Sequence, residues 1–313
     1  MSGPVTTGDV EVDGTVGGAE PGESSRAVEI TESRVSTVGE FAVRRALPRR
    51  ARRTVGPWCF IDHMGPAMLD ERGLGVAPHP HIGLQTVTWL LAGEALHRDS
   101  LGSEQVIVPG QLNLMTAGHG VSHSEEGTGR HGEVHGVQLW VAQPDETRDG
   151  APDFEHHAAL PQVEIGDAVA TVLVGQFADA TSPARRDTDH AGIQIGLRPG
   201  RATLPIRPEY EHALVVFDGA CVLDGALVEP GHLAYLGVGR DEVTLVAEAP
   251  TRALLVGGVP FDSPILMWWN YVARTRDEIV EAHREWSASS ERFGRVDSTL
   301  PRIEIGPPPW KAG

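Results

Sequence analysis

Two short stretches of the sequence hold the side chains best suited to binding a metal ion. PHPHIGLQT places His79 and His81 two residues apart, and GVSHSEE places His123 and Glu125 two residues apart. Residues i and i+2 of a β-strand point to the same face, so each pair projects together. Glu126 has the wrong parity to join them, which is why we choose Glu125. Two such strands facing each other across a barrel would offer three imidazoles and one carboxylate to one ion.

This donor set limits the metals that fit. Neutral imidazoles and a carboxylate suit Fe(II), Mn(II), Ni(II), Cu(II) or Zn(II), and neither Ca²⁺ nor Mg²⁺. Four protein ligands leave open positions on a six-coordinate ion, and a substrate or oxygen needs such positions in order to bind. A divalent ion and one carboxylate give a net charge of about +1, which would attract an anionic oxygen ligand.

The elements that must position these pairs are short strands. From about residue 60 to 142, the runs QTVTWLLAGEALHRDS, VIVPGQLNLMTAG and HGVQLWVAQP alternate apolar stretches with turn signals. Turns at a spacing of about 8–12 residues are typical of a β-sandwich or barrel. The layout returns in 193–258, where VVFDGACVLDGALVEPGHLAYL again has a strand, a Gly turn, a strand and a Pro-Gly turn. We therefore predict an all-β chain with two stacked antiparallel β-barrels of similar topology.

The predicted organisation has four parts. Residues 1–28 have almost no large apolar side chains, so we expect a disordered tail. We expect a first barrel with the metal site over 29–150 and a second barrel without metal over 151–262. The segment 263–313 ends in a Pro-rich tail, and a short helix is predicted over 276–287.

The helix prediction rests on its start signal and its spacing. Thr275 is followed three residues later by Glu278, which is the pattern of a capping box. Ile279, Ala282 and Trp286 then follow at helical spacing, so one face should pack on a barrel.

Composition narrows the classes of function. The 313 residues include 26 Lys and Arg against 43 Asp and Glu, a formal net charge of −17, so we expect no direct binding of nucleic acid. The two cysteines, Cys59 and Cys221, exclude a disulfide framework and suit a reducing cytoplasm. We see no secretory signal and no apolar run of about 18 residues, and we predict a cytoplasmic protein without a membrane span.

One basic cluster stands out on this acidic chain. Six arginines fall within RRALPRRARR, residues 44–53. The segment Arg44–Arg53 is either a docking patch for an anion or a protein partner, or a solvated loop whose arginines pair with acidic residues. The second interpretation is the more common case.

The sequence matches a known family in several stretches: VGPWCFIDHMGP (55–66), PHPHIGLQTVTWLLAGEALHRDSLG (78–102), IVPGQLNLMTAGHGVSHSEE (107–126), GVQLWV (136–141) and MWWNYVARTRDEI (267–279). In them the chain resembles the pirins, bicupin proteins of the cupin superfamily with jelly-roll barrels. The resemblance spans about residues 28 to 290. It implies one Fe(II) in the first cupin, held by the residues that match the family's ligands, here His79, His81, His123 and Glu125.

Further residues are predicted near the metal or away from it. The wider cupin pattern has a carboxylate four residues after HxH, and Gln85 stands there, so we predict a neutral group close to the site. Gln138 and His97 are also predicted beside the cavity, although a core role fits His97 equally well. His131 and His135 are expected at the surface. His212 and His232 stand alone on separate strands and indicate no second metal.

The resemblance implies two main classes of function. The first is a quercetin 2,3-dioxygenase-like enzyme that uses O₂ to cleave a small aromatic enol, with Glu125 as both metal ligand and catalytic base. The alternative is a redox-sensitive regulatory protein that binds a transcription-related or metabolic partner, with Arg44–Arg53 as the docking patch. A third, weaker hypothesis is that the site holds Zn or Ni and catalyses a non-redox step such as isomerisation. We expect a monomer.

Overall fold

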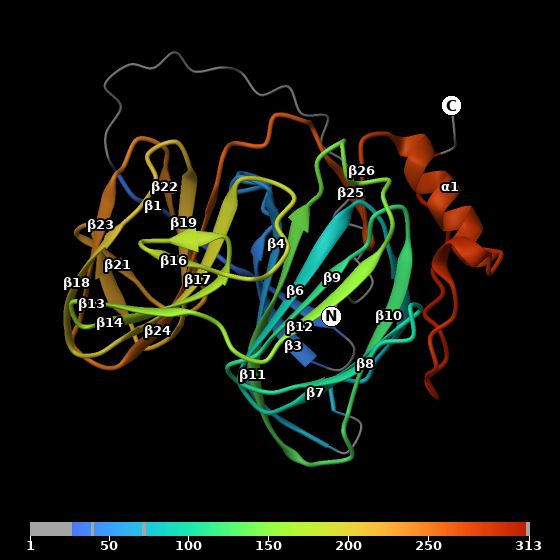
Figure 1. Cartoon of the computed structure of the whole chain (residues 1–313), viewed down its shortest axis with the longest axis horizontal. Coiled ribbons are helices and arrows are strands. Elements are labelled where there is room, and N and C mark those ends of the chain that lie inside the picture. Colours follow the sequence, from blue (N-terminus) through green and yellow to red (C-terminus); the bar gives the residue numbers. More distant parts are fainter. Residues whose placement is uncertain (1–26, 39–40, 71–72, 311–313) are drawn as a thin grey trace.

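The computed structural model describes residues 27–38, 41–70 and 73–310. These residues form two β-barrels that lie side by side, each with one large and one small antiparallel sheet (Figure 1). A C-terminal segment with a short helix lies against the outer side of the first barrel. The structure therefore confirms the all-β prediction, while residues 1–26 of the predicted tail fall outside the described residues.

The first barrel contains a seven-stranded and a four-stranded sheet. The large sheet has the order β12 (Asp153–His157), β9 (Leu112–Thr116), β6 (Leu84–Ala92), β11 (Gly132–Ala142), β4 (Trp58–Leu69), β3 (Phe41–Leu47) and β2 (Arg34–Val38). The small sheet has the order β5 (Val76–His81), β10 (Val121–Glu126), β7 (Ala95–Asp99) and β8 (Glu104–Ile107). In β7, burial alternates residue by residue, so His97 and Asp99 face the interior while Arg98 points outward.

The second barrel repeats this layout. Its large sheet has the order β1 (Glu29–Glu32), β22 (His232–Gly237), β19 (Glu211–Asp218), β24 (Thr251–Gly258), β17 (His190–Leu197), β14 (Ala168–Val174) and β13 (Gln162–Ile165). Its small sheet has the order β18 (Gly200–Pro205), β23 (Glu242–Ala247), β20 (Cys221–Leu223) and β21 (Ala226–Val228). A short hairpin joins β15 (Gln176–Phe177) and β16 (Ala180–Thr181). Strand for strand, the order matches the first barrel, as predicted.

The two barrels exchange one edge strand each. β1 precedes the first barrel in sequence but pairs with β22 of the second, and β12 follows it but pairs with β9 of the first. The boundaries predicted at 29–150 and 151–262 therefore do not follow the sheets at these two strands. The pairing is non-local, and the short polar sequences EITE and DFEHH do not specify which sheet edge they join.

The large sheets pack against each other between the barrels. Val87, Trp89 and Leu139 of the first barrel share one buried apolar cluster with Val215 and Leu254 of the second. Their alternate neighbours face the two barrel interiors. This period of two decides which side chains can reach a site inside either barrel.

The C-terminal segment contains β25 (Leu266–Trp268), β26 (Tyr271–Ala273), α1 (Arg276–Ser287) and the 3₁₀ turn η1 (Glu291–Phe293). α1 covers the predicted helix, and Thr275 Oγ1 accepts a hydrogen bond from Glu278 N at 3.2 Å. The Glu278 carboxylate accepts from Arg274 N rather than from Thr275 N, so the cap differs from the predicted box by one residue. No helix among the described residues has the length and apolar character of a membrane span.

Candidate metal centre

Three predicted ligands come together inside the first barrel. β5 supplies His79 and His81, and β10 pairs antiparallel with it, with His123 directly opposite His79. The expectation that the two strands face each other across the barrel is therefore wrong, because they are neighbours in the small sheet. All three side chains are fully buried, and their ligand atoms lie within 4.8 Å of one another. The Nε2 atoms of His81 and His123 are 3.0 Å apart. Two ligands at right angles on an ion, with bonds of about 2.1 Å, would be separated by about 3.0 Å. The triad can therefore hold a metal ion.

The hydrogen bonds of His79 and His81 leave the metal-facing nitrogens unprotonated. His79 Nδ1–H donates to the Ala77 carbonyl at 2.9 Å, and His81 Nδ1–H donates to the Asn270 carbonyl at 3.0 Å. A neutral imidazole has only one N–H, so each Nε2 keeps its lone pair. His79 Nε2 is buried and has no hydrogen-bond partner in the described part of the chain. Such an orphaned buried nitrogen is what a metal site requires.

Electrostatics favour the same protonation state. Burial lowers the pKa of His79 to about 4, because desolvation penalises the imidazolium form. Burial, followed by the neighbouring histidines, holds the pKa values of His81 and His123 well below their usual range. At neutral pH all three rings are uncharged and able to act as ligands.

Glu125 lies in the same buried chamber but outside the 4.8 Å group of imidazoles. It is opposite His97 in the regular ladder between β10 and β7, so it shares a face with His123, as predicted. Against β5 the register shifts, because His123 pairs with His79 while Glu125 pairs with Val76. This extra residue in β5 is a β-bulge, which re-aims the strand at this point. The role of Glu125 as a fourth ligand stays a prediction.

Behind His123, a chain of buried polar groups fixes its orientation. His97 Nδ1 lies 3.4 Å from His123 Nδ1, and His97 Nε2 lies 3.1 Å from Asp99 Oδ2. If His123 Nε2 is kept free for an ion, its Nδ1–H points to His97, and the His97 Nε2–H donates to Asp99. Burial alone would raise the pKa of Asp99, but hydrogen bonds from His97 and the Ser103 backbone lower it. One placement of protons thus satisfies the whole chain.

The two predicted glutamines lie in different places. Gln138 is fully buried, and its Oε1 accepts a 2.9 Å hydrogen bond from Thr88 Oγ1, which lies 3.5 Å from Glu125 Oε1. Gln85 instead donates to Thr116 Oγ1 at 3.0 Å. On β6 it shares the face of Val87, which packs between the barrels, and so it points away from Thr88 and Glu125.

The C-terminal segment supports the metal strands from outside. Besides the Asn270 carbonyl, it offers Val272 N to the Ile82 carbonyl at 3.1 Å, while Ser122 Oγ donates to the Phe293 carbonyl at 2.7 Å. At Gly83, with φ of +67°, a Cβ would come within 2.2 Å of the Val272 carbonyl oxygen. Sequence reasoning missed this support, because a backbone carbonyl 189 residues from His81 leaves no signal in residue types.

Comparison with known proteins agrees with this architecture. The family model described as pirin matches residues 40–141, and that of the pirin C-terminal cupin domain matches 193–294. The chain belongs to the pirin family. The structure places the family's HPH and HSE histidines in the buried triad.

Several similar proteins cover nearly the whole chain. A Pseudomonas aeruginosa protein named "putative quercetin 2,3-dioxygenase" is 45% identical over 276 residues, which are 87% of this chain and 88% of the relative. A pirin-like protein of Caulobacter vibrioides is 37% identical over 86% of this chain and 96% of its own length. The crystal structure of quercetin 2,3-dioxygenase from Acinetobacter baumannii superimposes with a TM-score of 0.87 and 39% identity, covering 91% and 97% of the two chains.

The arginine cluster of this pirin-family chain is not one surface. Arg45 is buried and forms a bidentate ion pair with Asp62, with both N–O distances at 2.8 Å. Arg52 pairs with Glu29 at 2.7 Å and lies over the Tyr235 ring. Two arginines are thus held by acidic residues, as the second interpretation expects, but Arg45 lies on β3 and is not solvated. The docking role of Arg44–Arg53 stays untested.

A second pair of histidines lies between the barrels. His63 Nε2 and His135 Nε2 are 2.8 Å apart, and each side chain is only 1% exposed. The prediction that His135 is exposed is wrong, because β11 extends under the second barrel, where Arg252 and Phe217 cover this residue.

Proposed function

We propose that this pirin-family protein is a metal-dependent dioxygenase that cleaves quercetin-type flavonols or related aromatic enols with O₂. The observation behind the proposal is the convergence of three buried, neutral imidazoles whose ligand atoms lie within 4.8 Å of one another. The names of the P. aeruginosa relative and the A. baumannii structure support the same reaction class.

The residues present fit a divalent ion. His79, His81, His123 and Glu125 would hold it, and we propose Fe(II), while Mn, Ni, Cu or Zn suit the same donors. When bound, the ion supplies Lewis-acid and redox chemistry to the enol and to O₂. The protein holds the imidazoles in the ligand tautomer through Ala77, Asn270 and the His97–Asp99 pair.

Glu125 is the proposed catalytic base. Its carboxylate is buried beside His79 and His97, and Thr88 lies next to Oε1. In this position it accepts the proton of the substrate's 3-hydroxyl, which leaves the enolate that O₂ attacks. Gln138 accepts a hydrogen bond from the Thr88 hydroxyl at 2.9 Å and so holds Thr88 in place beside the carboxylate.

Anaerobic purification, metal analysis and O₂ uptake with quercetin test the proposal on one sample. We expect one metal ion per chain and quercetin-dependent O₂ consumption, both lost in His123→Ala. His232→Ala is the matched control, because this half-buried histidine of the second barrel should leave both quantities unchanged. A full complement of metal without quercetin-dependent uptake would exclude the dioxygenase while leaving the metal site intact.

A further inference from the structure

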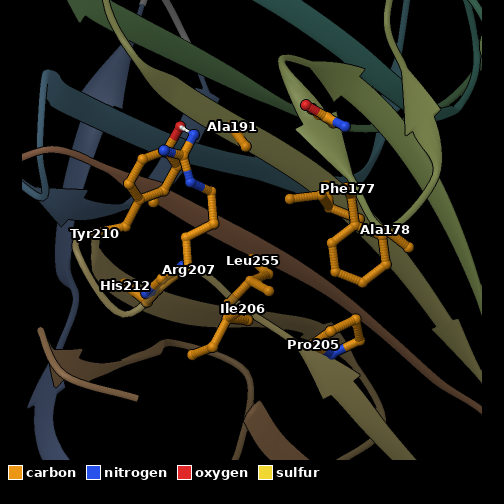
Figure 2. Close-up of a pocket in the computed structure, with 12 residues that line it drawn as sticks. Phe177, Ala178, Ala191, Pro205, Ile206, Arg207, Tyr210, His212 and Leu255 are labelled. Carbon is orange, nitrogen blue, oxygen red and sulfur yellow. Dashed lines mark hydrogen bonds between the residues drawn. The ribbon is translucent and has the colours of Figure 1, made fainter. Parts of the chain in front are cut away.

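The second barrel contains a cavity of about 300 Å³ that is separate from the metal centre (Figure 2). Pro205, the last residue of β18, lines it. β18 is the counterpart of β5, whose last residue is the ligand His81. The cavity therefore lies at the end of the second barrel that corresponds to the metal-binding end of the first. Its volume is at the low end for small-molecule sites, so any ligand must be small.

Apolar side chains form most of the cavity wall. Phe177 lies on one side, Tyr210 lies on the other, and Ile206 and Leu255 lie between them (Figure 2). Ile193 of β17 also lines it. The aliphatic residues continue into the apolar core of the barrel. The body of a bound molecule would therefore be apolar.

His212 is one of four residues with polar side chains in this wall, together with Gln176, Arg207 and Tyr210. The side chain is 5% exposed and its ring lines the cavity, while its Nδ1 is buried and the Tyr210 backbone interacts with the ring. Gly257 lies opposite it on β24, and a Cβ there would come within 2.5 Å of His212 Cδ2, so the glycine makes room for the ring. Burial lowers the pKa of His212 to about 4, and the ring is neutral at pH 7. A ligand that hydrogen-bonds to the ring would complete the pairing of a buried polar group.

The charges at the rim are already compensated. Arg207 Nη1 lies 3.0 Å from Asp189, its Nε lies 2.7 Å from Glu209, and its guanidinium stacks on the Tyr210 ring. The Tyr210 hydroxyl donates to Asp189. Because two carboxylates contact this one guanidinium, the rim does not select for an anion, unlike a site with an unpaired arginine.

We propose that this cavity binds a small neutral molecule with an apolar body and one hydroxyl, of which a single-ring phenol is the representative. A hydroxyl both donates and accepts a hydrogen bond, so it pairs with the His212 ring in either tautomer. Binding here does not depend on the metal or on the dioxygenase reaction.

The test uses the full chain with ¹³C-labelled isoleucine methyl groups, observed by NMR. p-Cresol should shift the signals of Ile193 and Ile206 and leave Ile107 of the first barrel unchanged. Toluene has the same apolar body without the hydroxyl, and it should bind about three- to ten-fold more weakly. Benzoate should bind more weakly than p-cresol. No shift of Ile193 and Ile206 up to the solubility limit of p-cresol, or stronger binding of benzoate, would overturn the proposal.

Two variants separate the hydroxyl from the cavity. His212→Leu should bring the affinities for p-cresol and toluene to within about two-fold of each other, because the hydroxyl loses its partner. Ala191→Leu should block both probes by filling the cavity that Ala191 lines. If Ala191→Leu does not fold, the comparison of p-cresol and toluene in His212→Leu still tests whether His212 recognises the hydroxyl. An unchanged preference for p-cresol in that variant would contradict the assignment of His212.

Discussion

The two barrels share one strand order but have opposite interiors. In the first, β5 and β10 place the buried residues His79, His81, His123 and Glu125 in the centre. In the second, the matching strands β18 and β23 place buried apolar side chains there, namely Ala202, Leu204, Val243 and Leu245. The barrel fold therefore depends on the alternation of buried and exposed positions, and the identity of the buried residues is left free for function.

A polar interior is stable only when its groups have partners. In the first barrel, His81 donates to the Asn270 carbonyl and His97 to Asp99, so burial does not leave these N–H groups unpaired. The second barrel needs few such partners, because its interior is mostly apolar. Support from the C-terminal segment is accordingly found at the metal-bearing strands, which β26 and η1 contact.

The largest expected effect is the loss of quercetin turnover when Glu125 of the first barrel is substituted. Glu125→Gln keeps the shape of the side chain but removes the proton acceptor, so quercetin turnover should fall about 10²- to 10⁴-fold. Metal content, measured on the same sample, should fall much less. Glu126→Gln is the control, because this neighbour pairs with Arg98 on the other face of β10. Equal losses of metal and turnover would show that Glu125 acts only as a ligand.

The support behind His123 should have a smaller effect. Asp99→Asn removes the charge that accepts the His97 N–H, so metal affinity should fall about 10- to 100-fold, as measured by competition with a chelator. Glu104→Gln is a suitable control, since its exposed carboxylate pairs with Arg98 outside the barrel. Unchanged metal affinity in Asp99→Asn would mean that the His97–Asp99 pair does not position His123.

The apolar interior of the second barrel should affect stability without affecting the metal. Leu204 is fully buried in the core of that barrel, so Leu204→Ala should lower the free energy of unfolding by about 2–5 kcal/mol. Denaturant unfolding measures the loss, and metal analysis of the folded variant should give the wild-type content. Loss of metal in this variant would show that the two interiors are coupled.

The sequence predicts the metal-binding histidines better than it predicts the groups around them. Spacing of two residues within a strand identified His79, His81 and His123, because the period of a strand is a local property. Gln85 was placed near the metal by counting from His81, but the turn at Gly83 separates β5 from β6 and changes the face. The position of a residue in the cupin pattern therefore does not by itself give the face of the sheet on which its side chain lies.

Contacts between residues far apart in the sequence could not be predicted either. The Asn270 carbonyl that orients His81 is a backbone group, and the exchange of β1 and β12 depends on sheet edges far away in sequence. The cavity beside His212 also arises from residues of several strands and a loop. A single histidine on a strand gives no signal of such a cavity.

The smallest expected difference concerns pH in the metal-free protein. Folding holds the pKa of His79 at about 4, below the unfolded value of about 6.5, so the unfolded chain binds more protons and stability is lost as pH falls below about 6.5. From pH 7 to pH 6, each such histidine should lower the free energy of unfolding by about 0.7 kcal/mol. His81 and His123 are shifted in the same direction.

Hydrogen exchange, corrected for intrinsic rates, can locate this loss. β5 and β10 should lose about 2 kcal/mol of protection from pH 7 to pH 6, because their three buried imidazoles gain protons on opening. β18 and β23 contain no histidine. They should lose less, because the pKa values lowered to about 4 in their barrel belong to His190 and His212 on the other sheet. If both pairs of strands lost protection equally, the barrels would open as one unit. The polar interior would then limit the stability of the whole chain rather than that of its own barrel.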